Sequence, residues 1–198
     1  MTETALTPDR ILDAAEDVLR RFGPAKATVV DVAQALGVSH GSVYRHFPSK
    51  AALRDAVTAR WLARIAAPLA AVAAEASPTP ERLRRWLDHL IASKRRLARE
   101  DPELFATYLA LAAEARAVVQ AHVDHLVGQI TQIIADGVAR GEFRAADPLA
   151  AGRAVFDATA RFHNPTHAVE WSDPGIDAAF EGVWALVLGG LGARRAVA

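Results

Sequence analysis

Thr-Pro and Asp-Pro pairs at five places constrain this chain more than any other feature, because each pair is typical of the start of a helix. A threonine or aspartate side chain caps free backbone N–H groups, and proline is tolerated in the first helical turn. Between the pairs, apolar residues recur at helical spacing, and no stretch shows the alternation typical of a strand. The sequence therefore predicts an all-α fold of about nine helices, with starts near Thr7, Thr79, Asp101, Asp147 and Asp173.

The composition allows one small helical module and one larger core. The chain has 198 residues, of which 52% are hydrophobic, and its 23 basic and 23 acidic side chains balance. It contains no cysteine, which excludes disulfides, thiolate metal sites and cysteine nucleophiles. No apolar run reaches the roughly 18–20 residues of a membrane span, and the N-terminal residues lack the basic start and apolar core of a signal peptide. We therefore expect a cytoplasmic protein without a membrane partner.

Residues 28–50 predict two short helices joined by a tight turn. Apolar residues occupy one face of the first helix at helical spacing. Thr28 and Asp31 stand three residues apart at its start, close to the arrangement of a capping box. Gly37 follows the last apolar position, where a chain leaving a helix often needs a positive φ, and Ser39 is a suitable N-cap for the second helix.

The second helix, expected over residues 40–47, buries little of its surface. Val43 and Phe47 are its main apolar anchors, which leaves other side chains to point outward: His40, Ser42, Tyr44, Arg45 and His46. A short helix with this distribution suits the major groove of DNA. The alternative, a helical hairpin within some other bundle, leaves the small Gly41 and an exposed tyrosine unexplained.

The pattern of residues 11–53 resembles the DNA-binding signature of the tetracycline-repressor (TetR) family. The resemblance is carried by Val32-Ala33, Leu36-Gly37-Val38-Ser39, the run Gly41–Lys50 and Leu53. It covers about a quarter of the chain, and the remainder is similar to the family only in length and helical character. The resemblance implies a three-helix, helix-turn-helix DNA-binding domain over residues 1–52 and a helical effector-binding and dimerisation domain over residues 53–198.

By the same resemblance, the protein would be a transcriptional regulator, most often a repressor, that binds a palindromic operator as a homodimer and is released by a small-molecule effector. Residues expected to contact phosphates are Thr28, Ser39, Tyr44 and Lys50. Residues expected at or near base edges are His40, Gly41, Ser42, Arg45 and His46. The acidic residues of the first helix are expected to face away from DNA. Because this surface has few cations, we expect moderate affinity per subunit and two subunits acting together.

The last two predicted helices cover residues 149–162 and 176–191, and the second of them separates its residues by size. Its large apolar residues lie on one side, whereas small residues fall within a band of roughly 60° on the other: Ala178, Gly182, Ala185 and Gly189. A helix that is apolar on two faces needs partners on two sides. We assign the small face to a second subunit, since the last two helices of the resembled family form its dimer interface. The alternative is that both faces are buried within one subunit.

Large aromatic residues are spread over several predicted helices of the second domain, where they fill a core or line an effector pocket. The candidate pocket residues are Trp86, Phe105, Tyr108, Phe156, Phe162 and His163. Few charges lie beside them, so the expected effector is apolar or amphipathic. The basic run over residues 82–99 is interpreted as a solvated helix face rather than a nucleic-acid patch. Pro68 predicts a kink, or two abutting helices, in the segment that links the two domains.

Catalytic motifs are missing from the sequence: it has no Gly-x-Ser-x-Gly elbow, phosphate loop or dinucleotide fingerprint. We therefore expect no enzyme activity and no cofactor. Seven histidines allow a metal hypothesis, in which His122, His163 and His167 with a carboxylate bind Zn²⁺ or Ni²⁺ in a metal-sensing regulator. The ordinary alternative is that these histidines are exposed or hydrogen-bonded. A further alternative keeps the helical fold without DNA binding, as a small-molecule carrier or scaffold.

Overall fold

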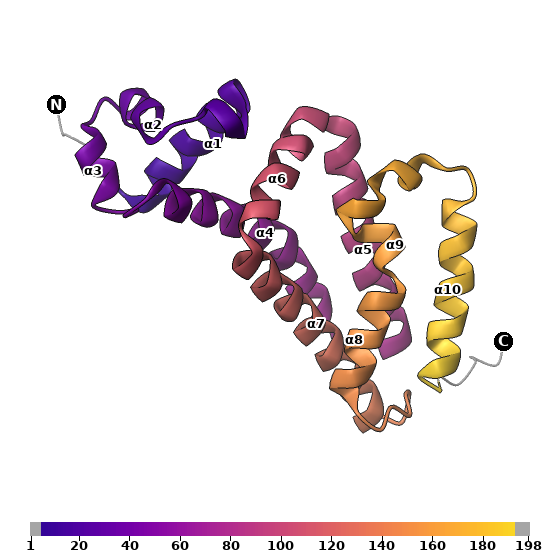
Figure 1. Ribbon diagram of the computed structural model, residues 1–198. Coiled ribbons are helices and arrows are strands. Elements are labelled where there is room, and N and C mark those ends of the chain that lie inside the picture. The colour runs from indigo at the N-terminus through magenta and orange to yellow at the C-terminus, as the bar shows by residue number, and fades with distance from the viewer. Residues whose placement is uncertain (1–4, 193–198) are drawn as a thin grey trace. The chain divides into compact units, whose positions relative to one another are not determined.

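The protein is helical throughout the part described by its computed structural model, residues 5–192 (Figure 1). Within this range the chain forms eleven helices, nine of them of seven or more residues, and no strand. The predicted all-α fold of about nine helices is therefore confirmed. The helices are α1 (Pro8–Lys26), α2 (Val29–Leu36), α3 (His40–Tyr44), α4 (Lys50–Ala73), α5 (Thr79–Glu100), α6 (Pro102–Glu114), α7 (Arg116–Ala139), α8 (Pro148–Ala158), α9 (Ala160–His163), the 3-10 helix η1 (Pro165–Ser172) and α10 (Ile176–Gly190).

The helices form two compact units. The first unit contains the residues up to Ala63 together with residues 101–120, and the second contains residues 64–100 and those from Ala121 onward. The chain therefore passes from one unit to the other within α4, between α5 and α6, and within α7. The predicted DNA-binding domain (1–52) and effector domain (53–198) are defined by function rather than by contacts, and this division stays a prediction.

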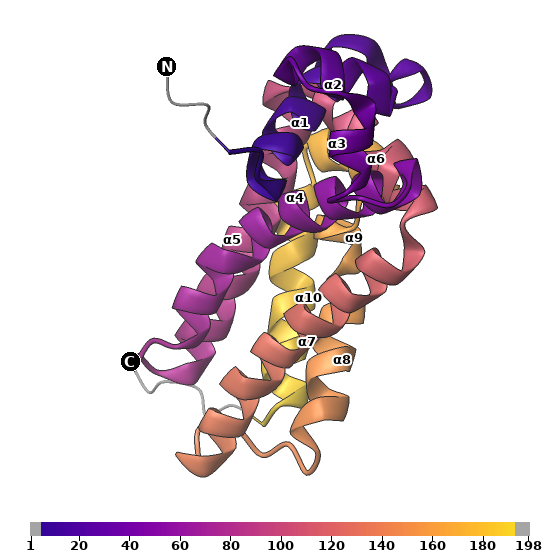
Figure 2. The ribbon, with the colours of Figure 1, turned by 90° about the vertical axis from the view of Figure 1, so that its left-hand side faces the viewer.

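The first unit packs α1, α2, α3, the start of α4 and α6 around one core, and Figure 2 shows α1–α3 gathered over the start of α4. The core residues come from every one of these helices, so the short α3 is held by its neighbours. The most buried are Ile11, Ala15 and Leu19 of α1, Val32 and Ala33 of α2, Val43 of α3, Val57 of α4 and Leu111 of α6.

The predicted helix caps of the first unit are present. Thr28 and Asp31 form a reciprocal capping box, in which the Asp31 amide donates to the Thr28 hydroxyl (3.2 Å) and the Thr28 amide donates to the Asp31 carboxylate (2.8 Å). Gly37 adopts φ 66°, ψ 29°, the left-handed conformation that glycine permits. Ser39 and Ser49 cap α3 and α4 by accepting from amides three residues on.

Two predicted helix boundaries are wrong. α3 ends at Tyr44 rather than near Phe47, because Pro48 disfavours the helical conformation in the residue before it. The chain after Tyr44 forms a tighter turn, in which the His46 amide donates to the Val43 carbonyl. The helix predicted over 149–162 is interrupted at Thr159, whose hydroxyl bonds back to the Val155 carbonyl. α10 begins at Ile176, as the predicted range 176–191 has it, but Asp173 ends η1 instead of capping this helix.

α4 continues through Pro68 as one helix, so the alternative of two abutting helices is wrong. By length and mean hydropathy (1.3) α4 also meets the criteria of a membrane-crossing helix, and 44% of its most apolar window is buried. A core helix of a folded protein meets the same criteria, so this finding carries little weight on its own.

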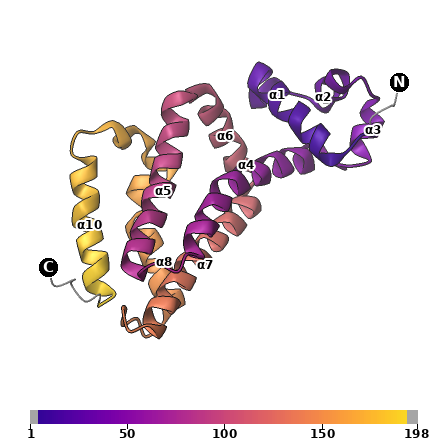
Figure 3. The ribbon, with the colours of Figure 1, turned by 180° about the vertical axis from the view of Figure 1, so that it is seen from behind.

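The second unit packs α5, α7, α8, α9 and α10 with the end of α4 around a second core, and Figure 3 shows α5 beside α8 and α10. Large apolar side chains dominate this core: Leu69, Leu83, Trp86, Leu87, Leu90, Leu126, Ile130, Ile133, Phe162, Ile176, Phe180 and Trp184. Two basic side chains of α5 are also inside, since Arg82 and Lys94 are only 1% and 4% exposed. The predicted solvated face is therefore wrong for these two residues, whereas Arg96 and Arg99 of the same run are exposed.

Arg82 is held inside the second unit by an ion pair with Asp136 of α7. Its guanidinium donates to the Asp136 carboxylate (2.7 Å) and to the Ala73 carbonyl (3.2 Å). Burial raises the pKa of Asp136, but hydrogen bonds from Arg82 and Gln132 outweigh it, so this pKa lies below its ordinary value. A carboxyl with a lowered pKa stabilises the fold at neutral pH, and this contribution is lost as pH falls through the folded-state pKa.

We expect Asp136→Asn to lower the free energy of unfolding by about 2 kcal/mol, because it leaves a buried guanidinium without its counter-charge. The variant should also lose part of the wild type's acid sensitivity. Urea denaturation at pH 7 and at pH 4 measures both effects. Asp17→Asn, which removes the acid of the exposed Arg20 pair, is the control and should leave stability unchanged. Equal stabilities of wild type and Asp136→Asn would contradict the structural role of this pair.

Candidate functional site

The nine residues predicted to contact DNA all lie in the first unit, and they are accessible. Eight are exposed and Ser42 is half-buried, with Tyr44 at 41% exposure. Val43 is fully buried and fastens α3 to the core, while Phe47 is half-buried beside it. The structure thus presents a short helix whose outer face carries donors and whose inner face is anchored.

Short-range contacts order the outer face of α3. The Ser39 and Ser42 hydroxyls are 2.9 Å apart, and the Arg45 guanidinium donates to the Ser42 hydroxyl (3.0 Å). The rings of His40 and Tyr44 meet edge to face, with centroids 6.3 Å apart. These contacts restrain the five side chains without burying them, which lowers the entropy that a bound partner must remove.

The Thr28 hydroxyl is already occupied at the start of α2. It donates to the Asp31 carboxylate (2.6 Å) while accepting from the Asp31 amide. The hydrogen bond from the Thr28 side chain is the main reason why the pKa of Asp31 lies below its ordinary value. Any phosphate contact by Thr28 must therefore share its hydroxyl with the helix cap.

Two arginines of α4, which the sequence did not single out, fix this helix within the first unit. Arg54 donates to Glu114 of α6 (2.7 Å) and to the Pro24 carbonyl. Arg60 donates to Glu16 (2.7 Å) and Asp13 (2.8 Å) of α1. Asp13 and Glu16 of α1 thus have a partner on α4. These three carboxylates lie 44 to 60 residues from the arginine that each contacts, so no local pattern revealed the pairs.

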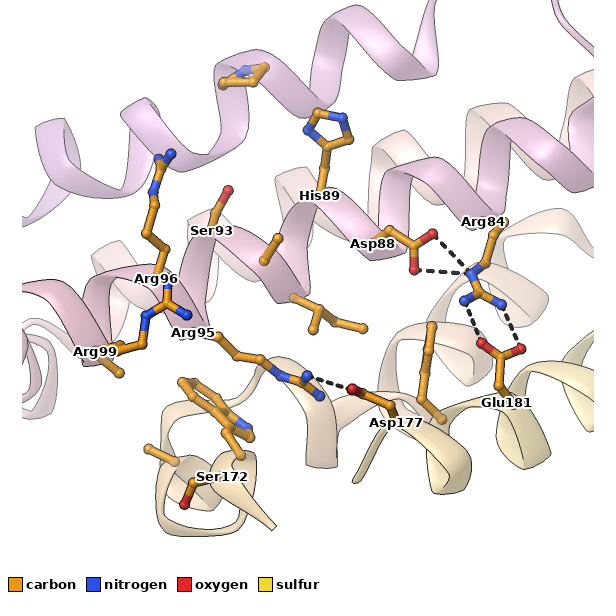
Figure 4. Close-up of a pocket in the computed structure, with 17 residues that line it drawn as sticks. Arg84, Asp88, His89, Ser93, Arg95, Arg96, Arg99, Ser172, Asp177 and Glu181 are labelled. Atoms are coloured by element: carbon orange, nitrogen blue, oxygen red, sulfur yellow. Dashed lines mark hydrogen bonds and ion pairs between the residues drawn. The ribbon is translucent and has the colours of Figure 1, made fainter. Parts of the chain in front are cut away.

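The second unit contains a wide groove of about 1390 Å³ between α5, η1 and α10 (Figure 4). Arg84 and Arg95 point from α5 toward α10, where they meet Glu181 (2.6 Å) and Asp177 (2.7 Å). The Arg84 guanidinium also lies over the Phe180 ring, 4.8 Å from its centroid. The hydrogen bond to Glu181 is the main cause that raises the pKa of Arg84.

None of the six predicted pocket residues lines this groove, whose aromatic residues are Trp171 and Phe180. Trp86, Phe156, Phe162 and His163 lie instead in the second unit's interior. The Trp86 indole donates to Gln129 (2.8 Å), and the Phe156 and His163 rings are 4.7 Å apart. The other two, Phe105 and Tyr108, belong to the first unit, with ring centroids 6.3 Å apart.

The small residues of α10 are all exposed, as are their neighbours Leu186 and Gly190, whereas Ile176, Phe180 and Trp184 on the other side are buried. The alternative in which one subunit buries both faces of this helix is therefore wrong. An exposed apolar stripe of this kind remains open to another helix.

The three predicted metal ligands do not assemble. His163 lies 3.2 Å from the Thr159 hydroxyl, and His167 lies 2.7 Å from Glu170. Across residues 5–192, no group of three His, Asp or Glu side chains is arranged to hold a metal ion. The metal-sensing hypothesis thus has no geometric support in this range.

Comparison with known proteins identifies the family. Residues 11–57 match the family described as bacterial regulatory proteins, tetR family, and residues 79–184 match the tetracycline repressor-like C-terminal domain. The chain belongs to the TetR family. Members of this family are transcriptional regulators rather than enzymes.

Relatives of this TetR-family chain agree with the fold. A helix-turn-helix-type transcriptional regulator of Mycobacterium tuberculosis is 34% identical over 105 residues, 53% of this chain and 50% of the relative. The chain thus spans about half the length of the curated relatives it matches. SmeT, the repressor of a Stenotrophomonas maltophilia multidrug efflux pump, has a similar fold, with a TM-score of 0.66 and 21% identity over 93% of this chain and 90% of SmeT. The complex of SmeT with triclosan gives a TM-score of 0.65 and 20% identity over 92% of this chain and 90% of that chain. A regulator from Haloarcula marismortui gives TM-score 0.68 at 21% identity, covering 93% and 97%.

We expect Ser39→Ala to destabilise the first unit by about 1 kcal/mol, because the Ser42 amide loses its cap. Denaturant unfolding measures the loss. Gln34→Ala, an exposed change on α2, is the control and should shift stability by less than about 0.5 kcal/mol. If both variants unfold at the same denaturant concentration as the wild type, the cap does not hold α3.

Proposed function

We propose that this protein is a transcriptional regulator that binds a palindromic DNA operator as a homodimer and changes its DNA affinity when a small molecule occupies the second unit. The observation that carries the proposal is the anchored, donor-bearing and exposed α3. Family membership supports the same function. Acting on an operator requires access to DNA, so the proposal places the protein in the cytoplasm.

In the proposed complex, α3 of each subunit enters one major groove, with half-sites about one helical turn (~34–36 Å) or a multiple apart. Tyr44 and Lys50 contact phosphates together with Ser39 and the shared hydroxyl of Thr28. The side chains that reach base edges are His40, Ser42, Arg45 and His46, and Gly41 lets the backbone approach closely. Arg45 must leave Ser42 to do so, which frees both groups for DNA.

The second copy is proposed to cover the small stripe of α10. Gly182 and Gly189 have open space where a side chain would begin, so another helix has room to approach closely. Burying this stripe with the exposed Leu186 removes apolar surface from water on both subunits, which favours association.

Regulation follows from unequal affinity of the effector for two arrangements of the dimer. SmeT, whose fold is similar, has been solved with triclosan, which supports a small organic effector here as well. α4 belongs to both units and is the element proposed to carry the change from effector to α3.

Fluorescence anisotropy over a range of salt concentrations, with the 198-residue chain and DNA flanking its own gene, tests the proposal. We expect a sequence-selective complex whose affinity falls steeply with salt. Lys50→Ala should weaken binding to all sequences alike and reduce the salt slope by about 1 per subunit. Arg20→Ala, on α1, is the matched charge control and should leave the slope unchanged. The absence of any salt-sensitive, selective complex would favour a carrier or scaffold instead.

We expect Ala185→Glu to convert a dimer into a monomer without unfolding it, because it places a charge in the exposed stripe but not in the core. Sedimentation velocity at micromolar protein measures the change, and circular dichroism checks the fold. Ala74→Glu, an exposed change outside α10, should leave the dimer intact. A wild type that sediments as a 21.2 kDa monomer would refute the dimer.

A further inference from the structure

We propose that the groove of the second unit binds a compact organic anion between three arginines of α5, and that this anion takes Arg95 from its partner Asp177 on α10. The three residues, Arg95, Arg96 and Arg99, are called the arginine cluster below. The anion is a phosphate or a carboxylate group of a small molecule. Only its role as the effector rests on the function proposed above.

The arginine cluster lies on one face of α5, and all three of its members line the groove. At 100° per residue their side chains fall within about 100° of the helix surface. Ala92, one turn earlier, lies within the same angular range and also lines the groove. Because the alanine side chain ends at Cβ, it leaves space above it, and Arg95 and Arg96 border that space at spacings of three and four residues.

The arginine cluster has more hydrogen-bond donors than its surroundings have acceptors. Arg96 is exposed and makes no hydrogen bond or ion pair within residues 5–192. Arg99 reaches only the neighbouring Glu100, at 3.4 Å, and both side chains are largely exposed. Arg95 donates from Nη1 to Asp177 (2.7 Å), while its Nε is buried and has no partner among the described residues. A buried donor without a partner costs free energy, so its presence beside a groove calls for a reason.

The carboxylates of the groove are concentrated away from Arg96 and Arg99, as Figure 4 shows. Asp88 and Glu181 both accept from Arg84, which lies three turns before Arg96 along α5. A long acidic segment of another protein would meet these two carboxylates as it followed the groove. A compact anion at the arginine cluster would not, and we therefore favour a small molecule.

The chemistry of arginine defines the class of this anion. The guanidinium fork matches the paired oxygens of a carboxylate or a phosphate. The groove has a volume of about 1390 Å³, which exceeds the roughly 300–1,000 Å³ of a small-molecule site. The anionic group therefore fills only one part of it, and Ala168 and Trp171 of η1 provide an apolar wall for the rest of the molecule.

Arg95 is available to the anion because its present ion pair is weak. The Asp177 side chain is 84% exposed, so water screens the pair and solvates the carboxylate once it is released. Exchange breaks one of the two ion pairs that join α5 to α10 within the described residues; the other is Arg84 with Glu181. If the anion is the effector, its binding thus reaches the helix that carries the proposed dimer stripe.

Calorimetric titration of inorganic pyrophosphate and of citrate into the 198-residue chain, without DNA, tests the site. The ionic strength is held at about 0.15 M, at which charges more than about 8 Å apart are largely screened. We expect at least one anion to bind with a Kd below about 1 mM, because several charge-assisted contacts act together. Tighter binding of pyrophosphate indicates a phosphate ligand, and tighter binding of citrate a carboxylate. If neither anion saturates the protein by about 10 mM, the proposal is overturned.

Arg96→Gln should weaken binding of the tighter probe about fivefold or more, since it removes one charged contact. The change is on the surface, so circular dichroism should show an unaltered fold. Arg116→Gln, which removes an exposed arginine of the first unit, is the matched control and should leave the Kd within about twofold. Equal losses in the two variants would mean diffuse attraction by net charge and would refute the site.

Asp177→Asn tests the exchange by a gain of affinity. It frees Arg95 from its internal competitor, so the probe should bind about fivefold more tightly. Asp157→Asn removes an exposed carboxylate of α8 outside the groove and changes the net charge equally, yet it should leave the Kd within about twofold. Unchanged or weaker binding by Asp177→Asn contradicts the exchange at Arg95. Failure to bind an operator would refute only the proposed regulator, because these titrations contain no DNA.

Discussion

The burial of Val43 is the contact on which the DNA-binding interpretation depends. α3 has five residues, far too few for a helix that is stable by itself. It persists because Val43 is fully enclosed by the first unit's core and because Ser39 caps its start after the left-handed turn at Gly37. The outward-facing side chains of α3 are therefore positioned by the buried Val43 and by the Ser39 cap at the start of the helix.

The second unit shows the reverse arrangement, with charge placed inside. Arg82 is neutralised by Asp136, which makes it a structural ion pair. Lys94, three turns further along the same helix, is also buried, with 4% of its surface exposed. A core built only for stability would favour apolar residues at both positions.

Local chemistry was predictable from the sequence, and long-range chemistry was not. The Thr28 capping box, the left-handed Gly37 and the Ser39 cap involve residues within a few positions, and all were anticipated. The ion pairs of Arg54 with Glu114 and Arg84 with Glu181 join residues 60 and 97 apart, and no sequence pattern announces them.

Lys94 is an intermediate case, because a signal for its burial existed. Leu83, Leu87, Leu90 and Lys94 follow one another at spacings of four, three and four, which places the lysine on the apolar face of α5. We interpreted the many basic residues of this helix as a solvated face, and so did not predict that Lys94 is buried. Which residues surround it depends on how α5 packs against the other helices of the second unit, and only the structure supplies this.

Hydroxyl-radical footprinting on DNA flanking the protein's own gene tests the central claim most directly, because it records where α3 meets the duplex. We expect two protected segments on one face of the DNA, about one helical turn or a multiple apart and related by an inverted repeat. Uniform cleavage along the fragment, or protection of a single unrepeated segment, would contradict it.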